Sequence, residues 1–433
     1  MLLLQRGFDL SLFGSRPTRL IRPGWKSDRL DFARAQAGGA VSASLGADDA
    51  TWSEVAADVP RYYGSARRLR VEGQRTNGNR NPRFDSASVG TPGSPGTNLT
   101  LSQPGSGIAA SVAGVGTDSG AAYIDVRVYG TASSAVATTA GLLSFDTTTA
   151  ISAANGQVWS AAFTARIVAG AFAGTLTQDI SERAAGGGAV RQNNTALSAP
   201  ESTDARLSSS ATLVGGVTTA GVQQVLRWGC GSGAVVDFTL RIKLPQIEQA
   251  SFASTPILPA SGTPAASTRG ADLLSAPLAR LGIRDSGACT VLGTFMIPQA
   301  APSGVSQILF CVDDGTAANR LLIRNAASTT ALVPVRTLAN STAQGSSAGS
   351  FTPGSAFAVG AAMAGDGSIR MSLAGGSIQS VSGGPTSGLT TIRGGVDASG
   401  ASNLFGDVGY LDILPYAVSD AQLQALVAAM PLS

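Results

Sequence analysis

The sequence predicts an all-β protein, because its composition and its patterning both favour short strands over helices. Of the 433 residues, 54 are glycine, 13% are charged and 6% are aromatic. Such a chain, rich also in Ala, Ser and Thr, is typical of many strands joined by tight turns. Several segments alternate between apolar and polar residues, as half-buried antiparallel strands do. The length allows two to four domains, each with its own core.

Residues 1–75 are predicted to form an N-terminal arm that docks on a larger particle and supports oligomerisation. Residues 1–50 mix apolar side chains such as Phe13 and Trp25 with basic ones, a mixture too apolar for a disordered tail. We expect such a segment to order against another surface. The alternative is that it folds back on its own domain, as ordered termini often do.

Residues 76–250 are predicted to form a jelly-roll sandwich. Its clearest strands, by period-two alternation, are Tyr123–Tyr129, Val158–Val168 and Asp237–Leu244. The polar, glycine-rich stretch 184–210 is expected to be a long loop or hairpin. Residues 251–270 carry three prolines among Ser, Thr and Ala, so we expect a stiff, extended linker there.

Residues 271–433 are predicted to form a second antiparallel sandwich. Its strands are expected at Thr290–Ile297, Gln307–Val312, Arg320–Arg324, Ala356–Met363, Ser368–Leu373 and Gly406–Leu414. A short helix should begin after Ser419, whose hydroxyl can cap the first turn while Gln422 occupies the capping-box position.

Two motifs lie near the predicted domain boundaries. The first is Leu69–Asn77, which reads LRVEGQRTN and follows Pro60 and Arg61. The second is Leu244–Asp272, which contains QIE, then FAST, and ends with a Thr-Arg pair and an aspartate. Together they resemble motifs of bacteriophage virion fibre and spike proteins, a group that includes tail fibres and the head spikes of gene transfer agents. The chain departs from that pattern at Ala250, where glycine is usual, and at Ala260, where threonine is common.

The resemblance implies a modular virion surface protein. Residues 76–250 would then be a jelly roll of the carbohydrate-binding-module type. The ending GDVGYLDIL, followed by the predicted helix, resembles the end of concanavalin or laminin-G-like sandwiches, which implies that fold for residues 271–433. A fold by itself does not give a function, so the site has to be argued separately.

Four residues are candidate sugar contacts. Trp228, next to Arg227, could stack on a sugar ring, although a core position is the alternative. Asp313 and Asp314 precede Gly315 and could bind a sugar or supply oxygens to a calcium ion. The preferred interpretation of this Asp-Gly pair is a hairpin turn. No other cofactor is indicated, because the three cysteines lack metal-site spacing.

The absence of histidine argues against an enzyme. It removes the usual base of a Ser or Cys triad and the commonest transition-metal ligand. Glycoside cleavage by two carboxylates remains the alternative, so a polysaccharide depolymerase has to be considered. The candidate acids, each expected to be a solvated or turn residue instead, are Asp125, Glu182, Glu201, Asp237, Asp313 and Asp314.

Charge and hydropathy limit the partners. Residues 1–75 carry twelve Lys or Arg against eight Asp or Glu, and the remainder carries eighteen against nineteen, which does not favour nucleic-acid binding. No apolar run approaches the length of a membrane span, and Gln5 and Arg6 interrupt the apolar start, so neither membrane insertion nor secretion is expected.

We therefore predict a homo-oligomeric virion surface subunit, assembled in bacterial cytoplasm, that binds other virion proteins through its arm. It would attach the particle to host polysaccharide without catalysis, and several copies would raise a weak affinity. The alternative is a structural capsid- or tail-decorating adaptor that anchors a separate receptor-binding chain. The bland Ser, Gly and Ala composition of Ser341–Gly354 and Gly375–Ser387 favours that alternative.

Overall fold

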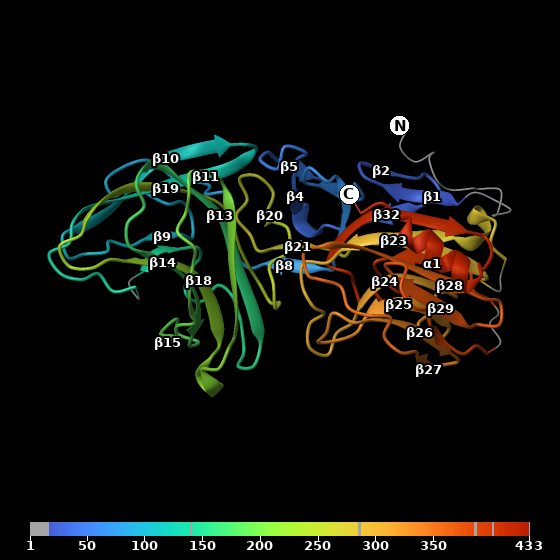
Figure 1. Cartoon of the computed structure of the whole chain (residues 1–433). Helices are drawn as coiled ribbons and strands as arrows, with labels where there is room; N and C mark the ends of the chain where they lie inside the picture. The colour runs from blue at the N-terminus through green and yellow to red at the C-terminus, as the bar shows by residue number, and fades with distance from the viewer. Residues whose placement is uncertain (1–16, 139–140, 285–286, 385–387, 401, 433) are drawn as a thin grey trace. The chain divides into compact units, whose positions relative to one another are not determined.

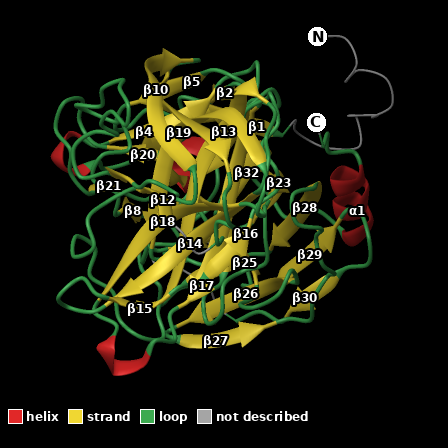
Figure 2. Cartoon of the chain, turned by 90° about the vertical axis from the view of Figure 1, so that its left-hand side faces the viewer, coloured by secondary structure: helices red, strands yellow, loops and turns green. Residues whose placement is uncertain are grey.

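A computed structural model of the chain describes residues 17–138, 141–284, 287–384, 388–400 and 402–432. Within them, the regular structure is almost entirely antiparallel strand, with one α-helix, α1 (Asp420–Ala428), close to the C-terminal end (Figure 2). The all-β fold class is confirmed. The chain divides into two compact units: unit 1 holds the described parts of Met1–Arg34, Asp58–Gly73 and Ala271–Ser433, and unit 2 holds Ala35–Ala57 and Gln74–Gly270.

Unit 2 is a sandwich of two sheets with one main apolar core between them (Figure 1). The five-stranded sheet has the order β10-β11-β19-β13-β17, and the six-stranded sheet has the order β15-β14-β18-β12-β9 with β16 paired to β14. The first sheet consists of β10 (Ile108–Asp118), β11 (Ala121–Thr131), β13 (Val158–Gly170), β17 (Ala205–Thr212) and β19 (Val235–Glu248). The second consists of β9 (Thr100–Leu101), β12 (Gly141–Ser144), β14 (Thr175–Arg183), β15 (Ala189–Arg191), β16 (Asn194–Ala196) and β18 (Gly221–Gly229).

Strand β19 shows why the sequence folds this way. Phe238, Leu240 and Ile242 are fully buried on the core face, and on the other face Asp237 is exposed and Arg241 is half-buried, whereas Thr239 and Lys243 are buried. The alternation ends at Leu244, which has a φ of 52° and lies at an irregularity in the pairing of β13 with β19. Every residue from Ile242 to Glu248 is buried, and the last five of them belong to the second sequence motif.

The predicted linker is paired within unit 2. Strand β20 (Ile257–Leu258) pairs with β4 (Val41–Leu45), which also pairs with β5 (Trp52–Val55), and β21 (Ser267–Arg269) pairs with β8 (Arg75–Asn77). The extended backbone that prolines favour is also a backbone that can join a ladder. Ile257 and Ser267 are buried by this pairing, so residues 251–270 do not form a free spacer.

Unit 1 is also a sandwich of two sheets around one core. The nine-stranded sheet has the order β2-β1-β32-β23-β28-β29-β30, with β7 on β32 and β6 on β7, and the seven-stranded sheet has the order β27-β26-β25-β24-β31-β22-β3. The first consists of β1 (Thr18–Arg22), β2 (Trp25–Lys26), β6 (Arg61–Tyr63), β7 (Arg68–Val71), β23 (Cys289–Met296), β28 (Ala356–Met363), β29 (Ile369–Leu373), β30 (Gln379–Val381) and β32 (Gly406–Leu414). The second consists of β3 (Asp31–Ala33), β22 (Leu273–Pro277), β24 (Gln307–Asp313), β25 (Arg320–Asn325), β26 (Leu332–Leu338), β27 (Ser341–Gln344) and β31 (Thr391–Gly394).

Helix α1 follows the sequence prediction closely. Ser419 is the N-cap, and its side chain and that of Gln422 form the expected capping box. Leu423, Leu426 and Val427 pack on apolar residues of β23 and β28, in a cluster separate from the core between the two sheets. The helix therefore covers the outer face of the nine-stranded sheet.

The described part of the predicted N-terminal arm does not stand apart from the two units. Residues 17–34 and 58–73 add strands to the sheets of unit 1, and residues 35–57 belong to unit 2. Leu20, Ile21 and Leu69 are fully buried in the unit 1 core, so this segment folds back because it completes that core. Residues 1–16 lie outside the described residues, and docking of the arm on a particle stays a prediction.

Candidate functional site

Trp228 and Arg227 lie on β18, and both are buried. Trp228 is 1% exposed, its indole nitrogen donates to the carbonyl oxygen of Ala173 at 2.8 Å, and its ring packs near Phe238. Arg227 lies 2.6 Å from Asp179 in a buried ion pair. A tryptophan buried to this extent has no ring face available to a sugar, so Trp228 takes the core position that the sequence left open.

Asp313 and Asp314 lie in unit 1, at the end of β24 and in the loop that follows it. Asp313 is fully buried and pairs with Arg393 at 2.7 Å. Asp314 accepts hydrogen bonds from Thr316 and Asn319 of its own loop. Burial would raise the pKa of Asp314, but these hydrogen bonds outweigh it and lower the pKa. Within the described residues no group of three or more His, Cys, Asp or Glu is placed to hold a metal ion.

Each of the other candidate acids forms an ion pair or hydrogen bonds within the same chain, or is exposed. Asp125 pairs with Arg241, and Asp237 pairs with Arg127. Glu182 accepts hydrogen bonds from Thr219 and from the backbone of residues 214 and 215. Burial would raise the pKa of Glu182, but these hydrogen bonds together hold it below its ordinary value. Glu201 is exposed.

The two sequence motifs meet in unit 2, where their amide side chains form a buried junction. Asn77 donates to the carbonyl oxygens of Pro245 and Ile257 at 3.2 and 3.0 Å, and its Oδ1 accepts from the backbone of Ile247 at 3.1 Å. The Gln246 Oε1 accepts from the backbone of Ile257 at 2.7 Å. Both side chains are fully buried, so the motif residues join β8, β19 and β20 through hydrogen bonds.

A buried carboxylate completes this junction. Glu248 accepts from the backbone and the hydroxyl of Ser254 at 2.7 and 2.6 Å. Burial raises the pKa of Glu248 above its ordinary value, and the hydrogen bonds from Ser254 and the charges of Arg269 and Arg75 offset this only in part. The junction therefore carries a carboxyl group that binds a proton more tightly than an exposed one would.

Three further motif residues, Arg61, Glu72 and Asp272, form a cluster of buried charges with Arg34 in unit 1. Asp272 lies 3.0 Å from Arg34 and 2.5 Å from Arg61, and Arg61 lies 2.8 Å from Glu72. These four side chains are 0 to 4% exposed. The residues that mark the resemblance are therefore mostly interior residues that hold the fold together.

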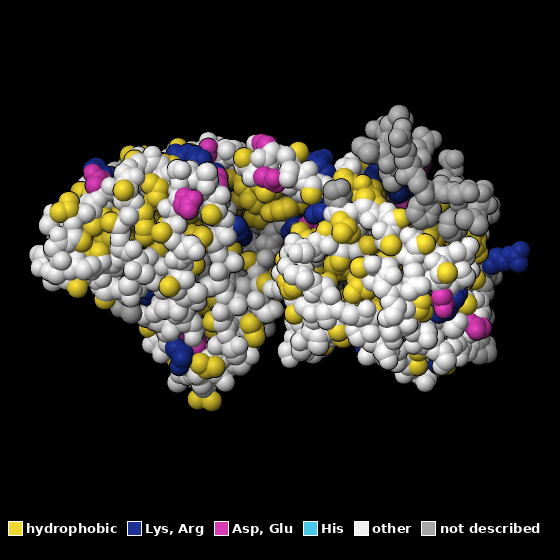
Figure 3. All heavy atoms as spheres, in the orientation of Figure 1, with side chains coloured by type: hydrophobic (Ala, Val, Ile, Leu, Met, Phe, Trp, Pro, Cys, Tyr) yellow, Lys and Arg dark blue, Asp and Glu magenta, His cyan; other side chains and the backbone are white. Residues whose placement is uncertain are grey.

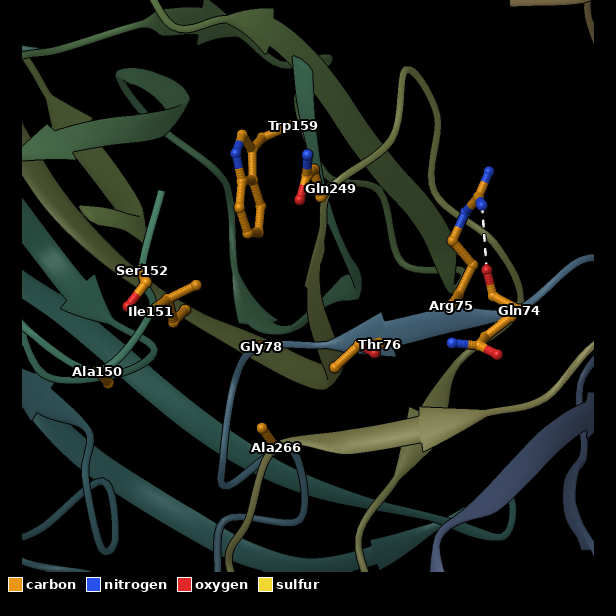
Figure 4. A pocket seen from close by; sticks show the side chains of 10 residues that line it. All are labelled: Gln74, Arg75, Thr76, Gly78, Ala150, Ile151, Ser152, Trp159, Gln249 and Ala266. Atoms are coloured by element: carbon orange, nitrogen blue, oxygen red, sulfur yellow. Dashed lines mark hydrogen bonds between the residues drawn. The ribbon is translucent and has the colours of Figure 1, made fainter. Parts of the chain in front are cut away.

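A pocket of about 360 Å³ lies beside the unit 2 junction (Figure 4). We call it the Trp159 pocket. It is lined by Gln74, Arg75, Thr76, Gly78, Ala150, Ile151, Ser152, Trp159, Gln249 and Ala266. A volume of this size is within the range of small-ligand sites.

Each side of the Trp159 pocket comes from a different element. Figure 4 shows the indole of Trp159, from β13, projecting into the space between Ile151 and Ser152 on one side and Gln249 on the other. Trp159 is 6% exposed, and its ring nitrogen donates to Gln157 at 3.1 Å, which fixes the ring as a wall.

The polar groups of the pocket come from ends of strands. Gln249 directly follows β19, and Gln74 directly precedes β8; both are exposed, whereas Gln246 and Asn77, each three positions away along the chain, are buried. The hydroxyl groups of Thr76 and Thr268 lie 2.8 Å apart across the pairing of β8 with β21. The buried junction therefore holds in place the strand ends that carry the exposed residues Gln74 and Gln249.

The chemistry of the Trp159 pocket suits binding. Its side chains offer amides, hydroxyls, an apolar wall and one charged group, the guanidinium of Arg75. Arg75 stacks on Phe252 with 5.4 Å to the ring centroid and donates to the carbonyl of Gln74 at 3.1 Å. No carboxylate is among the lining residues, so the pocket lacks the acid pair that glycoside hydrolysis requires.

The sequence placed Trp159 only within the predicted strand Val158–Val168, and none of the lining residues was predicted as a site. Trp159 does belong to a buried cluster with Ala161 and Ile247. A signal for the others existed, because Gln74 and Gln249 lie within the two recognised motifs. Exposed motif residues that alternate with buried ones are candidates for a surface role.

Figure 3 shows charged side chains scattered among uncharged ones on the face in view. Among the helices that the structure describes, none is both long and apolar enough to cross a bilayer.

Comparisons with known proteins give no family. The chain matches no protein-family model and none of the curated proteins. Among solved structures it is similar to a SAP-like pentraxin of Limulus polyphemus, with 13% identity and a TM-score of 0.27 over 32% of this chain and 69% of that one. It is also similar to a CBM40 module of Ruminococcus gnavus IT-sialidase bound to α2,3 sialyllactose, with 14% identity and a TM-score of 0.28 over 34% of this chain and 85% of that one. A tandem CBM22 domain of Paenibacillus barcinonensis matches over 78% of this chain and 96% of that one, at 10% identity and a TM-score of 0.24. Similarity at this level carries no conclusion about the function of this chain.

Proposed function

We propose that the chain is a non-catalytic carbohydrate-binding subunit of a virion surface spike or fibre, and that the Trp159 pocket receives a sugar of host surface polysaccharide. The observation that supports this most is the pocket lining. An indole and an isoleucine form an apolar wall, and amide and hydroxyl groups border it without any carboxylate. A sugar ring has apolar faces edged by hydroxyl groups, so it fits such a lining.

The place of the chain on a virion is part of the proposal and rests on the resemblance of its two motifs to fibre and spike proteins. A single pocket of this kind, with amides, hydroxyls and one guanidinium, gives weak affinity for one sugar. Several copies on one particle would bind a repetitive polysaccharide far more tightly, because each further contact forms at a high effective concentration. In this proposal the subunit is homo-oligomeric and contacts other virion proteins.

A structural role is the second candidate, and one observation favours it for unit 1. Asp313 and Asp314, the sugar and calcium candidates of that unit, already accept hydrogen bonds or pair with Arg393, Thr316 and Asn319 of the same chain. Unit 1 would then serve as a scaffold, while unit 2 binds the polysaccharide.

The test is retention of the purified full chain on capsular polysaccharide and lipopolysaccharide from candidate hosts, with polysaccharide viscosity followed in parallel. Gln249→Ala and Ser152→Ala change exposed lining residues, so they should preserve the fold. Each should weaken binding about threefold to tenfold, the range of one neutral hydrogen bond. Asp237→Asn, an exposed change on the same unit outside the pocket, is the matched control and should bind as the unmodified chain.

Retention without loss of viscosity, weakened by the two pocket variants, supports the proposal. Retention that the pocket variants do not alter would move the binding site elsewhere. A fall in viscosity would favour a depolymerase, and no retention on any host material would favour the structural adaptor.

A further inference from the structure

Strand β17 is an open edge of the unit 2 sandwich. It lies at the end of the five-stranded sheet and pairs along its whole length with β13, from Ala205 opposite Ala165 to Thr212 opposite Val158. Among the described residues, no strand pairs with its other side. None of its eight residues is buried. A long row of backbone N–H and C=O groups therefore faces away from the sheet.

The other sheet ends of the described structure are short or covered. Apart from β10 and β17, every strand at the end of a sheet has four residues or fewer. On β10, the backbone of Val112 donates to Pro92 and accepts from Gly90. The side chain of Gln103 binds both backbone groups of Ala110 at 2.9 Å. Short length and cover of this kind keep a sheet edge from pairing with another chain.

Strand β17 has none of these protections. From Leu207 to Thr212 it reads LSSSAT, without charge, proline or glycine, and its pairing with β13 has no irregularity. Its one charged residue, Arg206, turns back on its own unit, where a guanidinium nitrogen donates to the carbonyl oxygen of Leu244 at 2.7 Å. A long, regular and uncharged edge is the kind that pairs with a further strand.

The two faces of β17 differ in what they leave open to solvent. Leu207 and Ala211 are half-buried, and they pack on the apolar clusters of unit 2. Ser208 and Ser210, which point to the other face, are exposed. A strand added at this edge would cover the open sides of Leu207 and Ala211, because residues opposite each other in a sheet are neighbours on the same face.

We propose that β17 joins two copies of this chain, by antiparallel pairing with β17 of the second copy about a twofold axis at Ser209. In a twofold contact, a residue that touches a second residue is touched by it in turn. An axis at Ser209 meets this condition, because it sets Leu207 opposite Ala211 and Ser208 opposite Ser210. A large apolar residue then meets a small one, serine meets serine, and no like charges meet.

A second copy fits this edge better than a charged strand of another protein does. Between Leu207 and Thr212 the edge offers no charge that could pair with a charged partner. A neutral strand of small side chains meets no such mismatch, and β17 of a second copy is such a strand. The pairing does not depend on sugar binding, so it can fail or hold apart from the proposed function.

The pairing would also bring two Trp159 pockets together. Trp159 lies opposite Ala211, and Phe163 lies opposite Leu207. Three strand spacings of about 4.8 Å and an offset of about four residues would set the two Trp159 Cα atoms about 20 Å apart. One polysaccharide chain could then reach both pockets, which raises the effective concentration at the second.

The test measures self-association of the full chain without polysaccharide, by sedimentation from about 1 to about 200 µM. Dimer should form as the concentration rises. Two double variants change only the exposed residues Ser208 and Ser210. Ser208→Lys with Ser210→Lys sets like charges opposite each other at both symmetric contacts. Ser208→Lys with Ser210→Glu sets opposite charges there.

The two double variants should act in opposite directions. Like charges directly opposite destabilise an antiparallel pair, so the first should weaken dimer formation about tenfold. Opposite charges stabilise such a pair, so the second should dimerise at least as tightly as the unmodified chain. Added salt should narrow the difference. Ser232→Lys, at an exposed turn of the same unit, is the control and should dimerise as the unmodified chain does.

Four results are distinguishable. A dimer that the first double variant weakens and the second retains supports pairing at β17. A dimer that neither variant alters places the contact on another surface, which refutes the proposal. Equal weakening by both variants rules out the antiparallel register at Ser209. A chain that stays monomeric at every concentration overturns the proposal, and leaves this edge to a strand of a different protein.

Discussion

The two units bury the polar residues of the same sequence motifs in different ways. In unit 1, Arg61 and Asp272 form part of a cluster of opposite charges with almost no exposure. In unit 2, Asn77 and Gln246 use neutral amides to join strands through backbone hydrogen bonds. A cluster of charges depends on the presence of every member, whereas an amide junction loses hydrogen bonds one at a time. The difference teaches that motif residues can be structural in both units, while in unit 2 their exposed neighbours also line a pocket.

The largest effect should come from breaking the charged cluster. Asp272→Asn would leave Arg34 and Arg61 buried without their shared carboxylate, and should lower the stability of unit 1 by about 3 to 5 kcal/mol. Hydrogen exchange in peptides from β22 and β32 should report it. Arg280→Gln, which breaks the exposed pair with Asp31 in the same unit, is the control. Equal losses from the two variants would contradict the special role of the buried cluster.

A smaller loss should follow from Asn77→Ala in unit 2. The variant removes donors to two carbonyl oxygens and an acceptor for the backbone of Ile247, at a cost of about 3 kcal/mol. Denaturant unfolding followed by tryptophan fluorescence measures it, since Trp52, Trp159 and Trp228 all lie in unit 2. The control is Asn194→Ala, a change at an exposed position, which should leave the unfolding midpoint unchanged. An Asn77→Ala chain as stable as the unmodified one would show that the junction does not hold unit 2 together.

The pH dependence of unit 2 should distinguish its two buried acids. Burial raises the pKa of Glu248, so the folded state holds its proton more tightly and stability falls as pH rises from the ordinary glutamate pKa through the raised one. Glu248→Gln should remove that decline. Hydrogen bonds lower the pKa of Glu182, so its stabilisation is present above the ordinary pKa and is lost as pH falls through the lowered one.

The measurement is the unfolding midpoint of unit 2, followed by tryptophan fluorescence from about pH 3 to about pH 8. Glu248→Gln and Glu182→Gln should change the midpoint curve in opposite directions. Parallel curves for the two variants would mean that burial does not dominate at Glu248, and that the junction tolerates a charge as readily as the cluster of unit 1.

The smallest effect should come from the exposed ion pair of unit 2. Arg127 and Asp237 lie 2.8 Å apart with side chains 44 and 60% exposed, so solvent screens them. Asp237→Asn should leave the unfolding midpoint of unit 2 unchanged within error at physiological salt. A clear loss would show that ion pairs stabilise this chain wherever they lie, and would weaken the contrast between buried and exposed charges.

The sequence was most informative where one face of a strand is buried and the other is exposed. Strand β19 and the capping box of α1 were predicted because alternation and capping are local patterns. Strands β14 and β18 were missed because nearly every residue in them is buried, including Asp179, Glu182 and Arg227. Asp179 and Arg227 are buried as an ion pair and Glu182 through hydrogen bonds, so polar and apolar positions no longer separate into an exposed and a buried face.

The candidate site was predicted less well, for the same reason. Trp228 looked accessible because Arg227 is next to it, but its ring packs in the core between the two sheets near Phe238, while Arg227, on the opposite face of β18, is buried by pairing with Asp179. Asp313 looked like a turn acid, but Arg393, eighty positions later, buries it. Pairing over such separations cannot be read from neighbours in the sequence.

The sequence by itself determined the all-β class, the half-buried strands and the C-terminal helix, because these follow from patterns that repeat within a few residues. Only the tertiary structure decided which unit residues 17–75 and 251–270 belong to, and where the Trp159 pocket lies. Those features depend on strands far apart in the chain, such as β8 with β21 and β7 with β32, whose pairing is selected by the core that they complete together.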